Sequence, residues 1–372
     1  MTTLERPATA AGVAEALASG GTVRPVGGRT KIDWGAAGAE PDREVSTAAL
    51  DRVLAHNHGD LTAILEAGLR LGDAQAVFAA QGQRLALDLP DERREATIGG
   101  VVATGDSGPL RHRYGGARDL VLGVRVALPD GTVARAGSNV IKNVAGYDLA
   151  KLMCGALGTL GVVTEVTVRL HPVPSRTVTA VARGDDLESL TAGARALAHA
   201  SLQLEALDLR WDGREGGGRL LAQAAGHAAG EVAAAAAELA RAQGLDTHLV
   251  DDDDRLWEEQ RALQRATEGG AVLRVSGLPA ALARVLAAGT SGVARAGLGL
   301  AWLRIPALPE EVRRIRRELA PAACVLLDAP PALRVAVDAW GVRGPAVELA
   351  RRVKQRFDPG RVCNPGRHVG GI

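Results

Sequence analysis

Apolar and polar positions in the first 175 residues alternate in two different rhythms that glycines separate. Apolar residues at every second position predict strands within residues 61–68, 120–137 and 162–170, and residues 22–31 are predicted to be a short strand that breaks into a glycine turn. Apolar residues at every third or fourth position predict helices within residues 8–18, 71–82 and 146–161. Pro129, Asp130 and Gly131 turn the 120–137 segment into a hairpin, and Asp148 is expected near the start of the last helix.

The pattern changes after Pro172 and Pro174, where tight glycine turns become rare and alanines frequent. Strands are predicted within residues 176–184, 202–211, 219–226, 271–277, 299–305 and 323–329. Helices are predicted within residues 186–200, 230–244 and 309–319. Such alternation favours a second domain with a helix-covered sheet, followed by a tail that is a helix and two proline turns.

The run of aspartates at 251–254 invites comparison with a calcium loop. It lacks the glycine and the terminal glutamate of such a loop, so a solvated loop or a helix N-cap is the preferred interpretation. Cys154, Cys324 and Cys363 are far apart, which indicates neither a zinc site nor a disulfide framework. The sequence therefore predicts no metal site.

Length and charge narrow the class of protein. A chain of 372 residues exceeds what one hydrophobic core usually serves, so two domains are expected. Its 44 basic and 43 acidic residues give a net charge of +1, which offers no electrostatic reason to expect nucleic acid or acidic lipid as a partner. The start lacks the order of an export signal and no apolar run is long enough to span a bilayer, so a cytoplasmic protein without a transmembrane segment is expected.

Two glycine-rich segments, residues 27–31 and 97–108, are the candidate ligand sites. Neither has the spacing of a dinucleotide or P-loop motif. Glycines allow bare backbone N–H groups to approach a ligand, and nearby hydroxyls add small donors, a combination that suits a diphosphate. For one isolated segment a plain turn is the better interpretation. A third glycine cluster at Gly155, Gly158 and Gly161 weakens that alternative.

Several segments together resemble a known family. They are PVGGRTK, TIGGVVATGDSGPLRHRYGGARDLVLGVRVALPDGTV, KNVAGYDLAKL with GTLGVVTEV, and the terminal FDPGRVCNPGR. This combination resembles the PCMH-type, vanillyl-alcohol-oxidase-like FAD-binding oxidoreductases, and within them the FAD-binding E subunits of glycolate oxidases. The resemblance is strong over about residues 20–175, weaker through the second domain, and resumes at the tail.

The resemblance implies an α+β fold in three parts. Residues 1–174 are expected to form an FAD-binding domain of two α/β subdomains, and residues 175–350 an α/β cap domain. Residues 351–372 are expected to return and pack on the FAD-binding domain. A small-residue strand is expected over the second glycine segment.

The resemblance also implies an FAD whose diphosphate lies against both glycine segments. The residues expected to contact it are Pro25, Val26, Gly27, Gly28, Arg29, Thr30, Lys31, Pro90, Thr97, Ile98, Gly99, Gly100, Ala103, Thr104, Gly105, Ser107, Gly108, Arg111, Tyr114, Gly158, Gly161, Val162 and Val163. PVGGRTK lacks the histidine that links flavin covalently in some relatives, so the FAD is expected to be noncovalent.

The charged and aromatic residues near these segments carry weaker expectations. Arg29 is favoured over Lys31 as the cation beside the diphosphate, although each is equally compatible with a solvated surface charge. Lys142 and Tyr147 flank a turn that is a candidate to face the flavin ring, and a plain role at a helix entry is at least as compatible with them.

One departure from the family limits the functional prediction. Relatives that oxidise 2-hydroxy acids carry a late H-x-G-D-G-N-x-H segment, which is absent here, so the catalytic residues are unknown. The expected role is an FAD-containing subunit of a glycolate (2-hydroxy acid) oxidase or dehydrogenase complex. It would pass electrons to a D-type flavin subunit and an iron–sulfur subunit. The iron–sulfur cluster is expected in a partner, because the three scattered cysteines of this chain cannot supply its four ligands. Such a complex is expected in the cytoplasm, reaching the inner membrane only through partners.

Two other functions stay open. One is a stand-alone FAD-dependent oxidase or dehydrogenase of a small alcohol or 2-hydroxy acid. The other is an FAD-holding but catalytically silent scaffold subunit.

Overall fold

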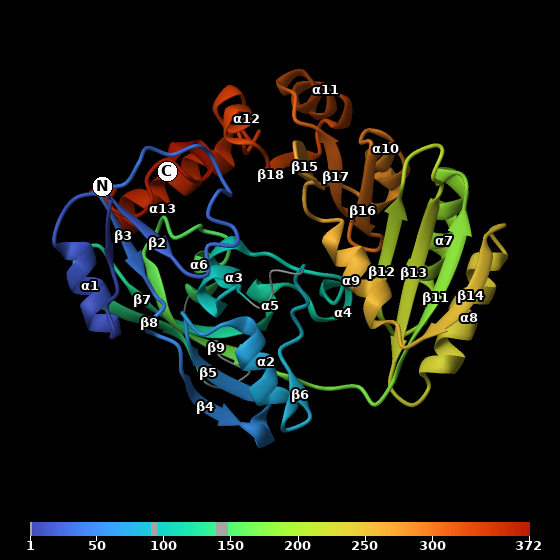
Figure 1. Cartoon of the computed structure of the whole chain (residues 1–372), viewed down its shortest axis with the longest axis horizontal. Helices are drawn as coiled ribbons and strands as arrows, with labels where there is room; N and C mark the ends of the chain where they lie inside the picture. Colours follow the sequence, from blue (N-terminus) through green and yellow to red (C-terminus); the bar gives the residue numbers. More distant parts are fainter. Residues whose placement is uncertain (1, 91–94, 139–147) are drawn as a thin grey trace. The chain divides into compact units, whose positions relative to one another are not determined.

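The computed structural model describes residues 2–90, 95–138 and 148–372 and divides into two compact units (Figure 1). Unit 1 comprises Met1–Ser107, Tyr114–Val173 and Val342–Ile372. Unit 2 comprises Gly108–Arg113 and Pro174–Gly341. The predicted α+β class is confirmed, and the carboxyl-terminal segment groups with the amino-terminal unit.

The first sheet of unit 1 is small and parallel. Its order is β1-β3-β2, with β1 at Thr3–Glu5, β2 at Val23–Val26 and β3 at Arg43–Ser46. Helix α1 (Ala10–Ala18) begins after Thr9, whose side chain accepts a hydrogen bond from the N–H of Gly12 at 3.0 Å. Its apolar face packs against the buried side chains Val23 and Val45 of this sheet.

The second sheet of unit 1 is antiparallel, with the order β4-β5-β9-β7-β8. Its strands are β4 (Val53–Asn57), β5 (Thr62–Glu66), β7 (Val121–Ala127), β8 (Val133–Gly137) and β9 (Val162–Arg169). These bounds confirm the strands predicted within 61–68 and 162–170 and the hairpin predicted within 120–137. The start of β9 follows the third glycine cluster directly.

The remaining elements of unit 1 are short. A two-stranded pair joins β6 (Gln83–Arg84) to β10 (His171–Pro172). The helices are α2 (Leu71–Ala79), α3 (Ile98–Thr104), α4 (Arg111–Tyr114, which crosses the unit boundary), α5 (Ala117–Leu120), α6 (Ala150–Met153) and α13 (Pro345–Phe357), with 3-10 turns at His58–Asp60 and Val369–Gly371.

Two elements differ from the expectations. Most of the second glycine segment is neither a turn nor a strand but the helix α3, capped by the Thr97 side chain, which accepts from the N–H of Gly100 at 3.2 Å. The helix expected within 146–161 is a single described turn, α6. Gly155, Leu157 and Gly158 have φ of 81°, 52° and 68°, and this left-handed backbone stops the helix.

Unit 2 is built on one eight-stranded sheet of order β14-β11-β13-β12-β16-β17-β15-β18, in which each described pair is antiparallel. Its strands are β11 (Thr177–Gly184), β12 (Leu204–Trp211), β13 (Gly218–Ala225), β14 (Asp246–Asp251), β15 (Gly270–Ser276), β16 (Ser291–Arg295), β17 (Leu300–Pro306) and β18 (Ala323–Asp328). The strands and helices predicted after residue 175 are found there.

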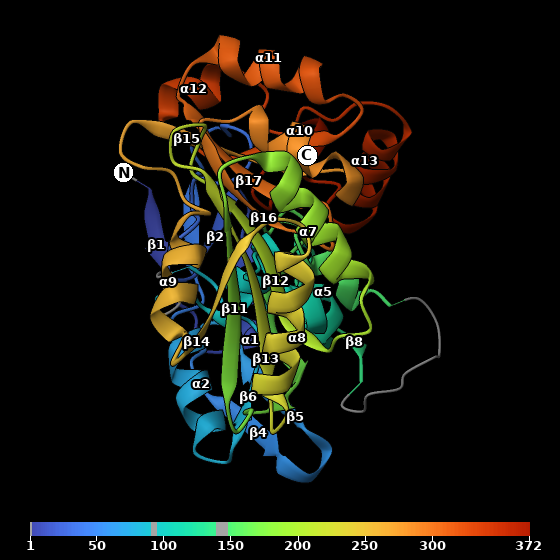
Figure 2. The same ribbon diagram turned by 90° about the vertical axis from the view of Figure 1, so that its right-hand side faces the viewer.

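Helices cover both faces of this sheet unequally. One core joins the sheet to α7 (Leu187–His199), α8 (Ala229–Arg241), α10 (Leu282–Ala287), α11 (Pro309–Leu319) and α12 (Pro331–Ala336). Figure 2 shows α7 and α8 lying along the strands. On the other face, Trp257 of α9 (Asp254–Ala262) packs against Val181, Ala206 and Leu221. A 3-10 turn at Pro279–Ala281 precedes α10.

The aspartate run lies at the entry to α9. Asp253 is the N-cap residue, is 1% exposed, and accepts hydrogen bonds from Thr177, Thr179 and Gln223 at 2.6–3.0 Å. Within the described ranges no group of three or more His, Cys, Asp or Glu side chains is arranged to hold a metal ion. No described helix has the length and apolar character needed to cross a bilayer.

Candidate cofactor site

A cavity in unit 1 is enclosed by segments that are distant in the sequence. Its empty volume is about 930 Å³, a figure that includes open solvent at its mouth. Four segments form its walls: the first glycine segment after β2, helix α3, the stretch from α6 to the start of β9, and the tail beyond α13.

Most residues expected to contact FAD line this one cavity. They are Pro25, Val26, Gly27, Gly28, Arg29, Thr30, Lys31, Thr97, Gly99, Gly100, Ala103, Thr104, Gly158, Gly161, Val162 and Val163. The three glycine clusters therefore meet in space, although about 65 residues separate the first from the second and about 46 the second from the third.

Seven expected residues lie elsewhere: Pro90, Ile98, Gly105, Ser107, Gly108, Arg111 and Tyr114. Ile98 is 2% exposed and belongs to the core, because it is on the buried side of α3. Gly108 and Arg111 group with unit 2. The Tyr114 ring packs 4.4 Å from the His171 ring and its hydroxyl accepts a hydrogen bond from Arg84 at 3.1 Å. Lys142 and Tyr147 lie outside the described residues.

The first glycine segment has the geometry of an anion cradle. A Cβ at Gly28 would lie 1.8 Å from the carbonyl oxygen of Glu95, so glycine is required for this close approach. Arg29 has φ of 60°, in the left-handed region. Within the described part of the chain, the backbone N–H groups of Gly27, Gly28, Arg29 and Thr30 donate to no protein acceptor. Consecutive unpaired N–H groups about a left-handed residue suit a phosphate.

Helix α3 contributes space rather than donors, which corrects the expectation of bare N–H groups there. The N–H of Ile98 donates to Leu69 O at 2.9 Å and that of Gly99 to Ala67 O at 2.7 Å. The Gly100 N–H is taken by the Thr97 hydroxyl. Because the donors of the first turn of α3 are occupied, this helix contributes small residues to the lining of the cavity rather than free N–H groups.

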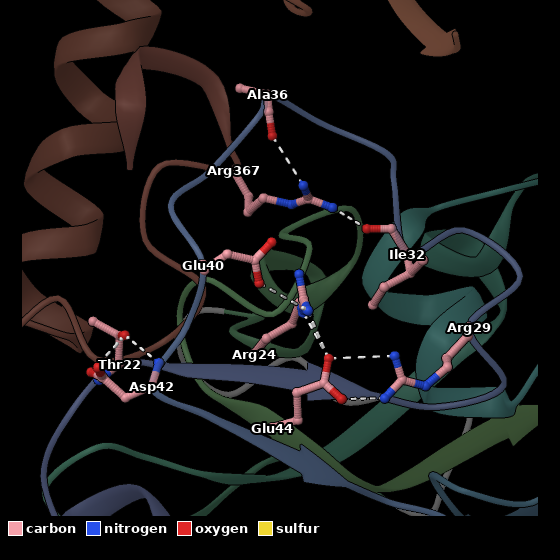
Figure 3. Close-up of polar contacts among 9 residues, drawn as sticks. All are labelled: Thr22, Arg24, Arg29, Ile32, Ala36, Glu40, Asp42, Glu44 and Arg367. Carbon is pink, nitrogen blue, oxygen red and sulfur yellow. Dashed lines mark hydrogen bonds and ion pairs between the residues drawn. The ribbon is translucent and has the colours of Figure 1, made fainter. Parts of the chain in front are cut away.

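Charged groups around the first glycine segment form two separate clusters, one around Glu44 and one that joins Lys31 to Asp106. Figure 3 shows Glu44 accepting from both Arg29 and Arg24. Burial raises the pKa of Glu44, but the hydrogen bonds and charges of the two arginines outweigh it and lower that pKa below the usual value. Lys31 pairs with Asp106 at 3.3 Å, where the two side chains are 4% and 2% exposed. Arg29 is 47% exposed, so Lys31 is the more deeply buried cation of the two.

The tail closes one wall of the cavity and was missed as a source of site residues. Asn364 donates from Nδ2 to Leu157 O at 2.7 Å, and Arg367 donates to Ala36 O at 3.2 Å and to Ile32 O (Figure 3). Burial lowers the pKa of Arg367, and the nearby charge of Arg24 adds to this. The NPGR motif at the tail marked this segment, but its place in the cavity depends on contacts across the whole unit.

Other lining residues carried no local signal. They are Ile32, Trp34, Thr47, Ala96, Val101, Met153, Ala156 and Leu157. For α3 a signal was present: a threonine followed by apolar residues at 98, 101 and 102 is the pattern of a capped helix with one buried face.

Lys354 fixes the tail to the third glycine cluster. It is 3% exposed, and its ammonium donates to Thr159 O at 2.6 Å, to Asp358 Oδ2 at 2.6 Å and to Cys363 O at 2.9 Å. Asp358 also accepts from the N–H groups of Val362 and Cys363 at 2.9 and 2.7 Å. These bonds position both the tail and the stretch before β9 as cavity walls.

Comparison with known proteins finds likenesses to the amino-terminal part of the chain. Residues 6–137 match the model of the FAD binding domain family. A mitochondrial D-lactate dehydrogenase [cytochrome] of Arabidopsis thaliana is 37% identical over 157 residues, which are 42% of this chain and 27% of that protein. The glycolate oxidase subunit GlcE of Escherichia coli (strain K12) is 43% identical over 115 residues, 31% of this chain and 33% of that protein. The matched stretches thus span about a third of these relatives' length.

Among solved structures, an alkyldihydroxyacetonephosphate synthase superposes with a TM-score of 0.73 at 14% identity, over 97% of this chain and 76% of that one. That likeness shows the fold. The family match shows that residues 6–137 are similar to the FAD binding domain family, and these two relatives align with parts of this chain no longer than 42% of its length.

Proposed function

We propose that this chain is an FAD-containing subunit of a 2-hydroxy acid oxidase or dehydrogenase complex, with glycolate as the first candidate substrate. The observation that carries the proposal is the cavity of unit 1, where four consecutive unpaired backbone N–H groups lie beside the buried cation Lys31. The bound FAD would accept two electrons from the substrate.

The residues present fit a noncovalent FAD. Gly27–Thr30 would hold the diphosphate through backbone N–H groups, with Lys31 offsetting its charge. The small residues of α3 and the apolar side chains of Val26, Val162 and Val163 would exclude water from the cofactor. None of the described residues lining the cavity is His, Cys or Tyr, so no side chain there is suited to a covalent flavin link.

The proposed complex and its substrate are inferred from the names of the relatives. GlcE is named as a glycolate oxidase subunit and the Arabidopsis thaliana relative as a D-lactate dehydrogenase, so 2-hydroxy acids are the shared substrate class. We propose that electrons leave this chain for a D-type flavin subunit and an iron–sulfur subunit, in a complex located in the cytoplasm and reaching the inner membrane through those partners.

Cofactor binding is tested on the purified chain by its absorbance spectrum and by acid precipitation. We expect a yellow protein whose flavin is released into the supernatant. Gly100→Phe should remove the flavin while far-UV circular dichroism is unchanged, because the new side chain occupies the cavity. Gly59→Phe is the control, since nothing lies within 4 Å of a Cβ at Gly59. A colourless wild type that cannot be reconstituted, or full flavin in Gly100→Phe, contradicts this site.

The subunit role is tested by following flavin absorbance after adding glycolate or D-lactate. We expect reduction only when the D-type subunit is present. Rapid reduction of the isolated chain would show a stand-alone dehydrogenase instead. An assembled complex whose activity is independent of this chain's flavin would show a scaffold.

A further inference from the structure

Three arginines stand in line across the sheet of unit 2. Arg183 of β11 lies directly opposite Arg219 of β13, which lies directly opposite Arg210 of β12. We call these the arginine row. Their neighbours Ala182, Leu220 and Leu209 are buried in the core under α7 and α8. Because side chains alternate along a strand, the arginine row points to the opposite face of the sheet.

The row is poorly neutralised by the protein itself. Arg210 pairs with Asp212 at 2.8 Å. In the described part of the chain, the side chains of Arg183 and Arg219 form no hydrogen bond or ion pair. Asp246 of β14 is directly opposite Arg183 at the end of the row, yet no ion pair joins them.

Like charges at directly opposed sheet positions are destabilising, so the row costs stability in the isolated chain. Arg304 is a further cation near the arginine row. Burial lowers the pKa of Arg304, and the positive charge of Arg210 lowers it further. The chain as a whole carries a net charge of only +1, so this concentration of positive charge is local. A local row, unlike a basic protein, suits a specific acidic partner rather than nucleic acid.

The spacing indicates what kind of partner fits. Neighbouring strands are about 4.8 Å apart, so the row spans roughly 10 Å in two equal steps. Glutamates at positions i, i+4 and i+8 of a helix are separated by similar steps, about 5–6 Å between Cβ atoms. We propose that the arginine row is a docking surface for the acidic face of a helix in a partner protein.

The test uses the full-length, FAD-loaded chain and a fluorescein-labelled, alanine-based helical peptide that carries glutamate at every fourth position. We expect salt-sensitive binding, measured by fluorescence anisotropy, and a loss of about tenfold in the variant Arg183→Glu/Arg219→Glu, from two reversed surface charges. The matched control is Arg195→Glu/Arg284→Glu. Both of these arginines are exposed, have no partner among the described residues, and lie on α7 and α10 on the other side of the sheet.

Equal loss in both double variants, or unchanged binding in the row variant, would overturn the proposal. So would the absence of binding at low salt, or displacement of the peptide by citrate at equal carboxylate concentration, which would mark a small-anion site. A second measurement concerns the row alone: relieving the repulsion by Arg219→Gln should raise Tm by about 2 °C, and a fall in Tm would count against the repulsive row. Flavin content reports separately on the FAD proposal.

Discussion

Replacing Lys354 by methionine tests whether one buried ammonium holds two walls of the cavity together. Its three hydrogen bonds reach a carboxylate and two carbonyl oxygens from segments about 200 residues apart in the sequence. Methionine preserves most of the side-chain volume but removes the charge and the three donors. Asp358, which is 0% exposed, is then left buried without its cation.

The expected loss in the free energy of unfolding depends on the hydrogen bonds that Asp358 keeps after the substitution. Removing one partner of a buried ion pair costs about 3–5 kcal/mol. Asp358 keeps the two backbone N–H donors of Val362 and Cys363, so we expect the lower end, about 3 kcal/mol. That is roughly a hundredfold change in the unfolding equilibrium of unit 1. Because the stretch before β9 and the tail both line the cavity, FAD affinity should fall as well.

Urea unfolding of the FAD-free chain, followed by circular dichroism, measures the stability change, and flavin fluorescence titration measures the affinity. Lys151→Met is the control, because Lys151 also pairs with an aspartate, at 3.2 Å, but its side chain is 39% exposed. It should cost less than about 1 kcal/mol. If the free energy of unfolding of Lys354→Met differs from that of the wild type by less than about 1 kcal/mol, the buried ammonium does not have the structural role assigned to it.

Three other perturbations give direct checks. Gly28→Ala should destabilise unit 1 by about 2 kcal/mol and release FAD, because its Cβ would meet the carbonyl of Glu95 at 1.8 Å; Gly59→Ala, with open space around it, should change neither the urea midpoint nor the flavin content. Burial raises the pKa of Cys363 to about 12, so Ellman's reagent at pH 8 should leave this thiol unmodified until the chain unfolds; rapid labelling of the folded chain would contradict its burial. The folded pKa of Glu44 is depressed below its ordinary value of 4.5, so its contribution is present above pH 4.5 and lost as pH falls through the folded pKa. The stability difference between wild type and Glu44→Gln should accordingly shrink from pH 7 to pH 3, and a constant difference would refute this assignment.

The sequence by itself determined the local elements and the chemistry of the first glycine segment. Alternation of apolar residues located β5, the β7–β8 hairpin and β9, because a strand with one buried face must alternate. Residues 27–31 were predicted as a glycine turn that faces a ligand, and they line the cavity. Such features depend on neighbours within a few positions, which a single sequence displays.

Two local predictions failed for reasons that are also local. Residues 98–104 form a helix because Thr97 caps it and Ile98, Val101 and Val102 bury one face, a weaker pattern than the glycines that suggested a turn. The 146–161 helix is short because the left-handed backbone at 155–158 stops it.

Only the tertiary structure decided which of these features act together. It showed that the α3 donors are satisfied by Leu69, Ala67 and Thr97, whereas those of residues 27–30 are not. It brought Asn364 and Arg367 to the cavity through Lys354, and it aligned Arg183, Arg219 and Arg210 across three strands. The physical reason is that hydrogen-bond satisfaction and strand register are set by contacts between residues far apart in the chain, which local patterns do not encode.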